Sequence, residues 1–401
     1  MKQSRLTLLA MVWLIAGCAA SVSAQAPTTE NGLSPRQLLT RLTNGVGTGT
    51  GVSSIGEVIA DLTALAVSTA PLGSSAGGFT FTFDPETRTF SRAAPSFGPN
   101  LGERAITAGQ GRANFGLNFI HSTYDSLDGL NLHDGSLDTA VLKIGSAPAY
   151  VGSADLDIKT DTLVLFSNVA LNDWFDFGIA VPYVSLKMTG VHTIADEQVS
   201  GSATASGLGD VALRAKVRLY RRGPEGVALG VDARLPTGDR EALLGTGVTR
   251  TLVSGIWSTT RGRLAPHASA GFEYWTNPFQ VYDPLQGAAI DAGRHALVYN
   301  GGMEWIASDR LTVNGEFTGR STNNGGRLGY RDLPFRANPF GITSASVASV
   351  TASGLSQVAV SGGVKWNFAG SALLTATILK SVTDAGLRDD WTPVVGMDWG
   401  F

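Results

Sequence analysis

Twelve stretches of this sequence carry apolar residues at every second position. A period of two indicates a β-strand, because successive side chains of a strand point to opposite faces. The stretches run roughly over residues 112–124, 156–168, 174–188, 207–220, 227–236, 249–258, 264–275, 294–305, 311–320, 353–368, 371–381 and 391–401. Each has the length of about ten residues that a tilted strand needs to cross a bilayer.

The connections between these stretches alternate between short and long. The short ones read VALND, RRGPEG, TTRGR, ASD and AG, and the long ones cover about 125–155, 190–206, 237–248, 276–293, 321–352 and 382–390. Transmembrane barrels have short periplasmic turns and longer outer loops. A soluble sandwich, which would bury the same apolar faces in a core, gives no reason for such alternation. An even number of strands also brings both ends of the barrel chain to the periplasmic side.

Composition supports a membrane barrel. Only 16% of the residues are charged and 50 of 401 are glycine, whereas soluble domains carry about 25% charged residues. After the N-terminus no run of eighteen apolar residues occurs, which excludes an ordinary transmembrane helix. Only a closed barrel then satisfies the backbone in lipid. The sequence predicts an all-β protein, with a transmembrane antiparallel β-barrel of about 12 strands at residues 112–401.

The first 24 residues read as a signal peptide. Lys2 and Arg5 precede an apolar stretch, and small residues before Gln25 suit cleavage after Ala24. The alternative is a lipobox that ends at Cys18, the only cysteine, which would become lipidated. Either processing event removes two positive charges from a chain of net charge −3, so no nucleic-acid partner is expected. With one cysteine, neither a disulfide within the chain nor a thiolate metal site is expected.

Residues 25–111 form a separate, partly helical N-terminal segment. PRQLLTRL follows Ser34 and reads as a helix, and SIGEVIADLTALAV places Ser54 and Glu57 at the spacing of a capping box. FTFTFDPETRTFS reads as a hairpin. A barrel of this size has an interior that needs filling. We therefore expect the segment to plug the lumen, and the alternative is that it hangs in the periplasm.

Charged side chains on the inward faces are the candidate lumen lining. In GLGDVALRAKVRLY, alternate residues that end with Tyr220 form a mostly polar set, which is assigned to the inward face. The residues between them, which begin with Val211, form an apolar set on the opposite face. The candidates are Asp210, Arg214, Lys216, Arg218, Asp232, Arg234, Glu304, Glu316 and Lys365. Opposite charges on neighbouring strands can pair. They would either keep the lumen rigid or tune the selectivity of a pore.

The final residues WTPVVGMDWGF continue the alternation to the carboxyl terminus. Trp399 and Phe401 fall in the apolar set, so we expect both to face lipid near the periplasmic interface. Outer-membrane barrels typically carry such a terminal aromatic residue as an assembly signal. Outer-membrane lipid and the barrel assembly machinery are therefore the expected partners.

One pair of residues raises the question of catalysis. His267 and Ser269 lie two apart and share a strand face, as do the His and Ser of an outer-membrane phospholipase with twelve strands. Here the face is predicted to point inward, and no asparagine is evident to orient the imidazole. The five histidines show no metal-ligand spacing. We expect no enzyme activity, no metal and no cofactor.

Several motifs resemble one known family. GLGDVALRAKVRLYRRG, GVDARLPTGDREALLGTG and DFGIAVPYVSL are similar to outer-membrane proteins associated with meta-pathway phenol degradation and described as transporters. The resemblance covers about residues 110–401. It implies an outer-membrane barrel that passes aromatic or other hydrophobic compounds. The family is distantly like the fatty-acid and toluene uptake barrels, which have more strands and an N-terminal hatch. The resemblance assigns no binding residue to this sequence.

The function expected from the sequence is therefore a channel or transporter in the cell outer membrane, for small hydrophobic or aromatic compounds. The alternatives are a structural or adhesive barrel with a closed lumen, acting through its long loops, and a hydrolase of the barrel phospholipase type.

Overall fold

The structure is a computed structural model. It describes residues 32–43, 54–74, 78–84, 89–92, 94–194, 197–277, 279–283, 288–334, 343–351 and 353–401. The signal-peptide and lipidation predictions concern residues outside these ranges.

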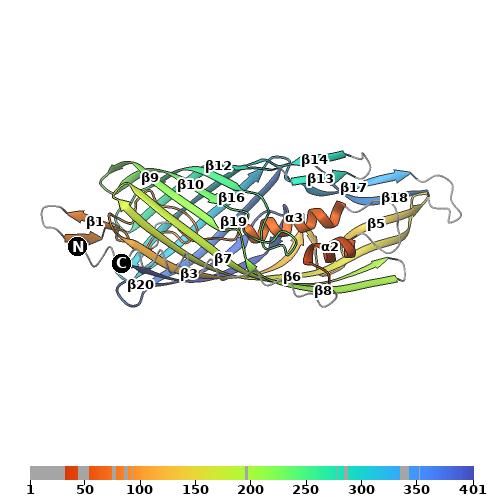
Figure 1. The fold of residues 1–401 in the computed structure, drawn as a ribbon, viewed down its shortest axis with the longest axis horizontal. Helices are drawn as coiled ribbons and strands as arrows, with labels where there is room; N and C mark the ends of the chain where they lie inside the picture. The colour runs from red at the N-terminus through yellow and green to blue at the C-terminus, as the bar shows by residue number, and fades with distance from the viewer. Residues whose placement is uncertain are drawn as a thin grey trace.

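Twelve long strands form a closed antiparallel barrel, as the sequence predicted (Figure 1). In chain order they are β3 (Ala113–Leu127), β6 (Ala147–Asn172), β7 (Phe175–Ile194), β9 (Ala212–Arg222), β10 (Glu225–Arg234), β11 (Arg250–Ser258), β12 (Leu264–Trp275), β15 (His295–Ser308), β16 (Leu311–Thr322), β19 (Leu355–Asn367), β20 (Ala372–Ser381) and β22 (Trp391–Gly400). Each pairs with the next along this series, and β22 pairs with β3 to close the ring. The absence of a free edge satisfies the backbone of every long strand.

The two ends of the barrel differ. At the end that we call the turn end, short connections join β6 to β7, β9 to β10, β11 to β12, β15 to β16 and β19 to β20. The opposite end, the loop end, carries the long connections, which hold further strands. These are β4 (Leu130–Asn131), β5 (Leu137–Ile144), β8 (Glu197–Leu208), β13 (Phe279–Asp283), β14 (Ala288–Ala292), β17 (Arg327–Pro334), β18 (Ser344–Thr351) and β21 (Leu387–Asp389).

The outward face of the barrel changes character at one level. On β6, Asp161 is the last of four charged outward residues counted from the loop end, and Leu163 begins an apolar run. Register places Phe119 and Tyr183 beside Leu163, and all three are exposed. His121 lies beside Asp161 and pairs with its carboxylate at 2.7 Å. A large contiguous surface of apolar side chains is unfavourable in water and marks contact with lipid or another protein. The upper edge of the lipid-facing belt therefore lies between Asp161 and Leu163.

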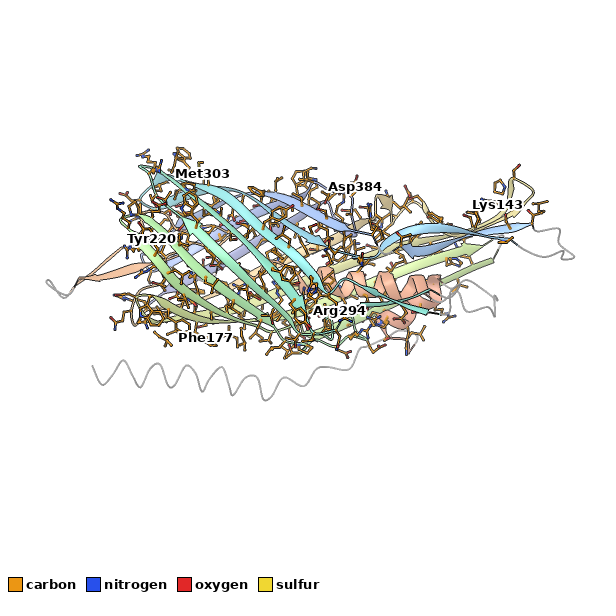
Figure 2. The ribbon with its side chains drawn as sticks, turned by 90° about the horizontal axis from the view of Figure 1, so that it is seen from above. Lys143, Phe177, Tyr220, Arg294, Met303 and Asp384 are labelled. Atoms are coloured by element: carbon orange, nitrogen blue, oxygen red, sulfur yellow. The ribbon has the colours of Figure 1, made fainter. Side chains whose placement is uncertain are left out.

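Below this edge, large apolar side chains cover the outside of the barrel. Figure 2 shows Phe177 and Met303 projecting from opposite sides, and each is 46% exposed. Exposed aromatic side chains occur near both edges of the belt: Phe119, Tyr183, Tyr274 and Trp391 toward the loop end, and Trp174, Tyr220, Trp305, Trp366 and Phe401 toward the turn end. Such aromatic girdles mark the two interfaces of transmembrane barrels.

One face assignment was wrong. Tyr220 was placed on the inward face of β9, but it is exposed, as is Leu219. The ladder between β9 and β10 shifts between Val227 and Ala228, so that Tyr220 pairs with Val227 and Arg218 with Ala228. The extra residue is a β-bulge, which reverses the alternation for everything beyond it.

At the loop end the strands continue past the belt and enclose two helices, α2 (Pro35–Thr43) and α3 (Ser54–Ser68) (Figure 1). Here the inward face is apolar. Leu156, Ile158 and Leu186 pack with Leu38 and Leu42 in one buried cluster. Hydrophobic burial therefore holds the helices to the extended strands. None of the helices that the structure describes is long and apolar enough to cross a membrane.

Polar contacts fix the two helices to each other. Ser34 and Gln37 form a capping box at the start of α2, since each side chain bonds the other residue's backbone N–H. Arg36 of α2 bonds Glu57 and Asp61 of α3, each at 2.6 Å. Burial alone would lower the pKa of the Arg36 guanidinium, but Asp61 and Glu57 outweigh it and the pKa is raised. The guanidinium stays charged and links both helices.

From α3 the chain runs down inside the barrel to the turn end. There β1 (Phe81–Asp84) and β2 (Thr89–Arg92) pair as the predicted hairpin, which projects from the barrel (Figure 1). The chain then re-enters, and residues 94–111 pack against the inner wall before β3 begins. Ala105 N donates to the Ser258 hydroxyl, and Ala108 N to the Asp176 carboxylate.

Candidate functional site

The barrel interior holds a cavity of about 380 Å³, which we call the chamber. Two parts of the N-terminal segment bound it along the barrel. The end of α3 and residues 69–73 form its ceiling toward the loop end. Leu101, Gly102 and Glu103 form its floor toward the turn end. The chamber thus lies inside the barrel, between these two parts of the segment.

The ceiling is held by charged wall residues. Arg234 and Arg250 both donate to the carbonyl oxygen of Ser68, the last residue of α3. The Ser68 hydroxyl donates to Asp210 at 2.7 Å. Arg214 donates to the carbonyl oxygen of Gly73 at 2.8 Å. Cations suit the C-terminal end of a helix, where carbonyl groups lack partners. The arrangement fixes the end of α3 across the barrel.

One carboxylate accepts three of the hydrogen bonds that hold the floor. Glu316 of β16 accepts bonds from the backbone N–H groups of Asn100 at 2.6 Å, Leu101 at 3.1 Å and Gly102 at 2.7 Å. Lys365 donates to the carbonyl oxygen of Pro99 at 2.6 Å. The floor and the residues just before it form no helix or strand. The bonds from the wall side chains therefore satisfy backbone groups that regular structure would otherwise pair.

Below the floor lies a buried polar cluster. The ring nitrogens of His267 lie 3.6 Å from Glu304 and 3.7 Å from Glu316, and all three side chains are inaccessible to solvent. The carboxylate oxygens of Glu304 and the Nε and Nη2 atoms of Arg104 have no hydrogen-bond partner among the described residues. The cluster fills the lumen around the floor and does not line the chamber.

This geometry differs from that of a barrel hydrolase. His267 and Ser269 share the inward face, as predicted, and the register puts Asn300 directly opposite Ser269, an asparagine that the sequence had not revealed. Both ring nitrogens of His267, however, face carboxylates. Ser269 lines the chamber, whereas His267 lies outside its lining. Among the described residues, no hydrogen bond joins Ser269 to His267, whereas a nucleophile and its base normally lie within hydrogen-bond reach.

The chamber has one strongly basic wall, built by strands β9 to β16. Arg214 pairs with Asp232 at 2.9 Å, and Arg234 lies 3.7 Å from the same carboxylate. Arg320 donates to both carboxylate oxygens of Glu273, one of them at 3.1 Å. The wall combines guanidinium groups from several strands at one level.

The facing wall is uncharged over the part that strands β3, β6 and β20 form. Strands β3, β6 and β20 contribute to the described lining only apolar and hydroxyl side chains: Ile120, Ser122, Tyr124, Thr160, Thr162, Leu379 and Ser381. Toward the ceiling, Arg388 and Asp389 of β21 also line the cavity and add one positive and one negative charge. Burial raises the pKa of the Asp389 carboxyl, although bonds from Thr392 and Trp391 act in the opposite direction. The chamber is therefore amphipathic across its width.

The predicted lumen residues fall into three groups. Arg214, Lys216, Asp232 and Arg234 line the chamber, and Asp210 holds the ceiling. Glu304, Glu316 and Lys365 surround the floor. Arg218 lies lower, beside Ala105 and Pro95. Lys216 faces Glu103 at 3.6 Å and Asp176 at 3.7 Å. Whether any of them sets selectivity stays a prediction.

Sequence reasoning missed three inward charged residues: Glu273 and Arg320, which line the chamber, and Arg250, which holds the ceiling. Each belongs to a predicted strand and faces inward by simple alternation, so the signal was present but was not used. At the chain end, Trp399 and Phe401 lie at the turn end, and Phe401 is 56% exposed. The described residues contain no group of His, Cys, Asp or Glu placed to hold a metal ion.

Comparison with known proteins identifies one family. The family model described as "Putative MetA-pathway of phenol degradation" matches residues 142–386. No curated protein matches the sequence.

Three solved barrels are similar in fold. An outer membrane channel from Pseudomonas putida F1 is 11% identical, with 72% of this chain and 95% of that chain covered and a TM-score of 0.45. A FadL homologue from Pseudomonas aeruginosa is 12% identical, with coverage of 83% and 96% and a TM-score of 0.33. The CymD monoaromatic hydrocarbon channel is 10% identical, with coverage of 72% and 88% and a TM-score of 0.32.

Proposed function

The chain belongs to the family described as "Putative MetA-pathway of phenol degradation", and from that membership and the chamber we propose that it is an outer-membrane channel for small hydrophobic or aromatic compounds. The belt of apolar side chains supports a place in a bilayer, with the loop end outside and the turn end in the periplasm. Lipid and the barrel assembly machinery are the partners that this place requires.

One observation carries the proposal. The chamber lies on the barrel axis between two parts of a single segment, the end of α3 above and residues 101–103 below. A structural barrel needs no cavity of this size, because filling it with side chains would add packing contacts. A site of about 300–1,000 Å³ is the usual size for small molecules. The chamber is therefore a stopping place for a permeant molecule.

Passage works without a chemical step. A molecule enters from the loop end, rests in the chamber and leaves toward the periplasm when the floor moves. The floor is suited to movement, since its backbone is held by wall side chains and not by a continuous ladder. The N-terminal segment then acts as a hatch inside the barrel.

The test compares uptake by cells that make the protein and cells that lack it. Radiolabelled phenol, toluene and octane are supplied at low concentration, and initial rates are measured before metabolism contributes. We expect faster entry of the aromatic compounds in cells with the protein. Equal rates for every compound would overturn the proposal and favour a structural or adhesive barrel. Hydrolysis of phospholipid by the purified protein in detergent, lost in a Ser269→Ala variant, would favour the enzyme.

A further inference from the structure

We infer that the chamber is a binding site for a small amphipathic monoanion, an aromatic carboxylate whose charged group lies against the guanidinium groups of Arg214, Arg234 and Arg320. This inference rests on the proposed function and specifies the substrate class of the same cavity. It follows from three features of the basic wall and the wall that faces it.

The first feature is a surplus of positive charge. Nine charged residues among those that the structure describes line the chamber. Five are positive and four are negative: Arg214, Lys216, Arg234, Arg320 and Arg388 against Glu103, Asp232, Glu273 and Asp389. The lining therefore carries one more positive than negative charge. A charge held away from bulk water attracts a single counter-ion far more strongly than an exposed one.

The second feature is a surplus of hydrogen-bond donors. A guanidinium carries five N–H groups and no acceptor. Among the described residues, Arg214 donates to Asp232 and to the carbonyl oxygen of Gly73. Behind the wall, outside the cavity lining, the Nε and Nη1 atoms of Arg250 are buried and have no hydrogen-bond partner among the described residues. The guanidinium groups of the wall therefore carry more N–H groups than Asp232, Glu273 and the carbonyl oxygen of Gly73 accept. A carboxylate supplies two oxygens whose spacing fits guanidinium groups, and such charge-assisted bonds are the strong ones.

The third feature is the opposite wall, whose strands β3, β6 and β20 contribute no charged side chain to the described lining. Ile120 and Leu379 give the cavity an apolar side, and Leu72 and Leu101 add apolar surface from the ceiling and the floor. A simple inorganic anion would leave this surface in contact with water. A ligand with an apolar ring and one carboxylate satisfies both walls at once, because the ring removes apolar surface from water while the carboxylate meets the guanidinium groups.

The chamber also discriminates between charge states. A neutral isostere keeps the ring but offers the basic wall one acceptor oxygen and no charge. An aromatic amine would bring a second positive charge against Arg214, Arg234 and Arg320. We therefore expect affinity to fall in the order carboxylate, amide, amine.

The test measures binding to the purified full-length protein in detergent by isothermal titration calorimetry. Benzoate, benzamide and benzylamine serve as probes of nearly equal shape. We expect benzoate to bind at least about tenfold more tightly than benzamide, and benzylamine not to bind measurably. Equal affinities for benzoate and benzamide, tighter binding of benzylamine, or no binding of any probe would overturn the inference.

Two variants act in opposite directions. Arg214→Gln removes a positive charge and should weaken benzoate binding about tenfold. Asp232→Asn removes a negative charge from the same pair and should strengthen it. Arg263→Gln, at an exposed turn outside the chamber, is the matched control and should leave the affinity unchanged. Should both wall variants weaken benzoate binding equally, the effect is structural and the charge argument fails.

The uptake assay separates this inference from the proposed function. If the protein speeds the entry of phenol and toluene while benzoate and benzamide bind alike, the channel stands and the anion site does not exist. If neither uptake nor binding occurs, both the channel function and the anion site are rejected.

Discussion

The carboxylate of Glu316 accepts a hydrogen bond from the backbone N–H of Asn100 at 2.6 Å, and this contact joins the barrel wall to the segment inside it. The two residues are 216 positions apart in the chain. The same carboxylate also accepts from Leu101 and Gly102. One side chain thus accepts three of the hydrogen bonds that hold the floor of the chamber, so its replacement tests the floor directly.

Replacement of Glu316 by Ala should open the floor. Three backbone N–H groups lose their acceptor, and each stranded donor costs about 1–3 kcal/mol unless water replaces the carboxylate. Water can reach the loop only if it moves, so conductance in planar bilayers should rise well above that of the natural protein. Glu225→Gln, an exposed position at a turn, is the control. Unchanged conductance in Glu316→Ala would show that the loop does not limit the pore.

Replacement of Arg36 by Met should loosen the two helices. Arg36 bonds both Glu57 and Asp61, and Asp61 is left with Arg240 at 3.2 Å as its remaining partner. Removing one member of a buried ion pair typically destabilises by about 3–5 kcal/mol, and Arg240 should reduce that loss. We expect faster hydrogen exchange in α2 and α3 with unchanged exchange in the barrel strands. Arg41→Met, on the exposed side of α2, should have no effect.

The position of the lipid-facing belt predicts that two outward residues of one strand respond differently to the same substitution. Leu165 and Asp157 both face outward on β6, one inside the belt and one above it. Arginine at Leu165 should destabilise the folded barrel by roughly 2 kcal/mol, since charges on the lipid face are expensive away from the interfaces. Arginine at Asp157 should change stability little. Urea unfolding in phospholipid vesicles measures both, and equal destabilisation would contradict the assigned belt.

The barrel itself was readable from the sequence because the membrane imposes a simple pattern. Alternation such as that of Val211 to Leu219 and turns such as RRGPEG depend only on neighbours in the chain. Alternation no longer predicts the face that a side chain takes where the strand register changes. The bulge at Leu219 exposes Tyr220, and no local signal marks it.

The loop-end extension was also hidden. EQVSGSATASGL, which becomes β8, is rich in Gly, Ser and Thr and lacks an apolar alternation. It forms a strand because β7 offers a long edge beside it and α2 packs near it. Tertiary context decides such segments.

The chamber could be predicted only in part. The inward charges on β9 and β10 were found from alternation, but the residues that they meet were not. Asn100 bonds Glu316, and Ser68 bonds Arg234. The two residues of each pair are more than 160 positions apart in the chain. Such pairings carry no periodicity, so the floor and the ceiling become visible only when the segment is seen inside the barrel.

The central claim is that the segment inside the barrel gates passage, and a reversible cross-link tests it most directly. The Cβ atom of Ala105 lies 3.2 Å from the position that a Cβ on Gly226 would take, near the separation of about 3.5–4.5 Å found in disulfides. Ala105 follows the floor by two residues, so a disulfide between Ala105→Cys and Gly226→Cys should hold the floor against the wall.

The measurement is the initial rate of labelled toluene uptake by cells that make this double variant, before and after a reducing agent, with each single variant as control. The account predicts that the oxidised variant admits toluene no faster than cells without the protein, and that reduction restores the natural rate. Rapid uptake that is the same in the oxidised and reduced states would contradict it.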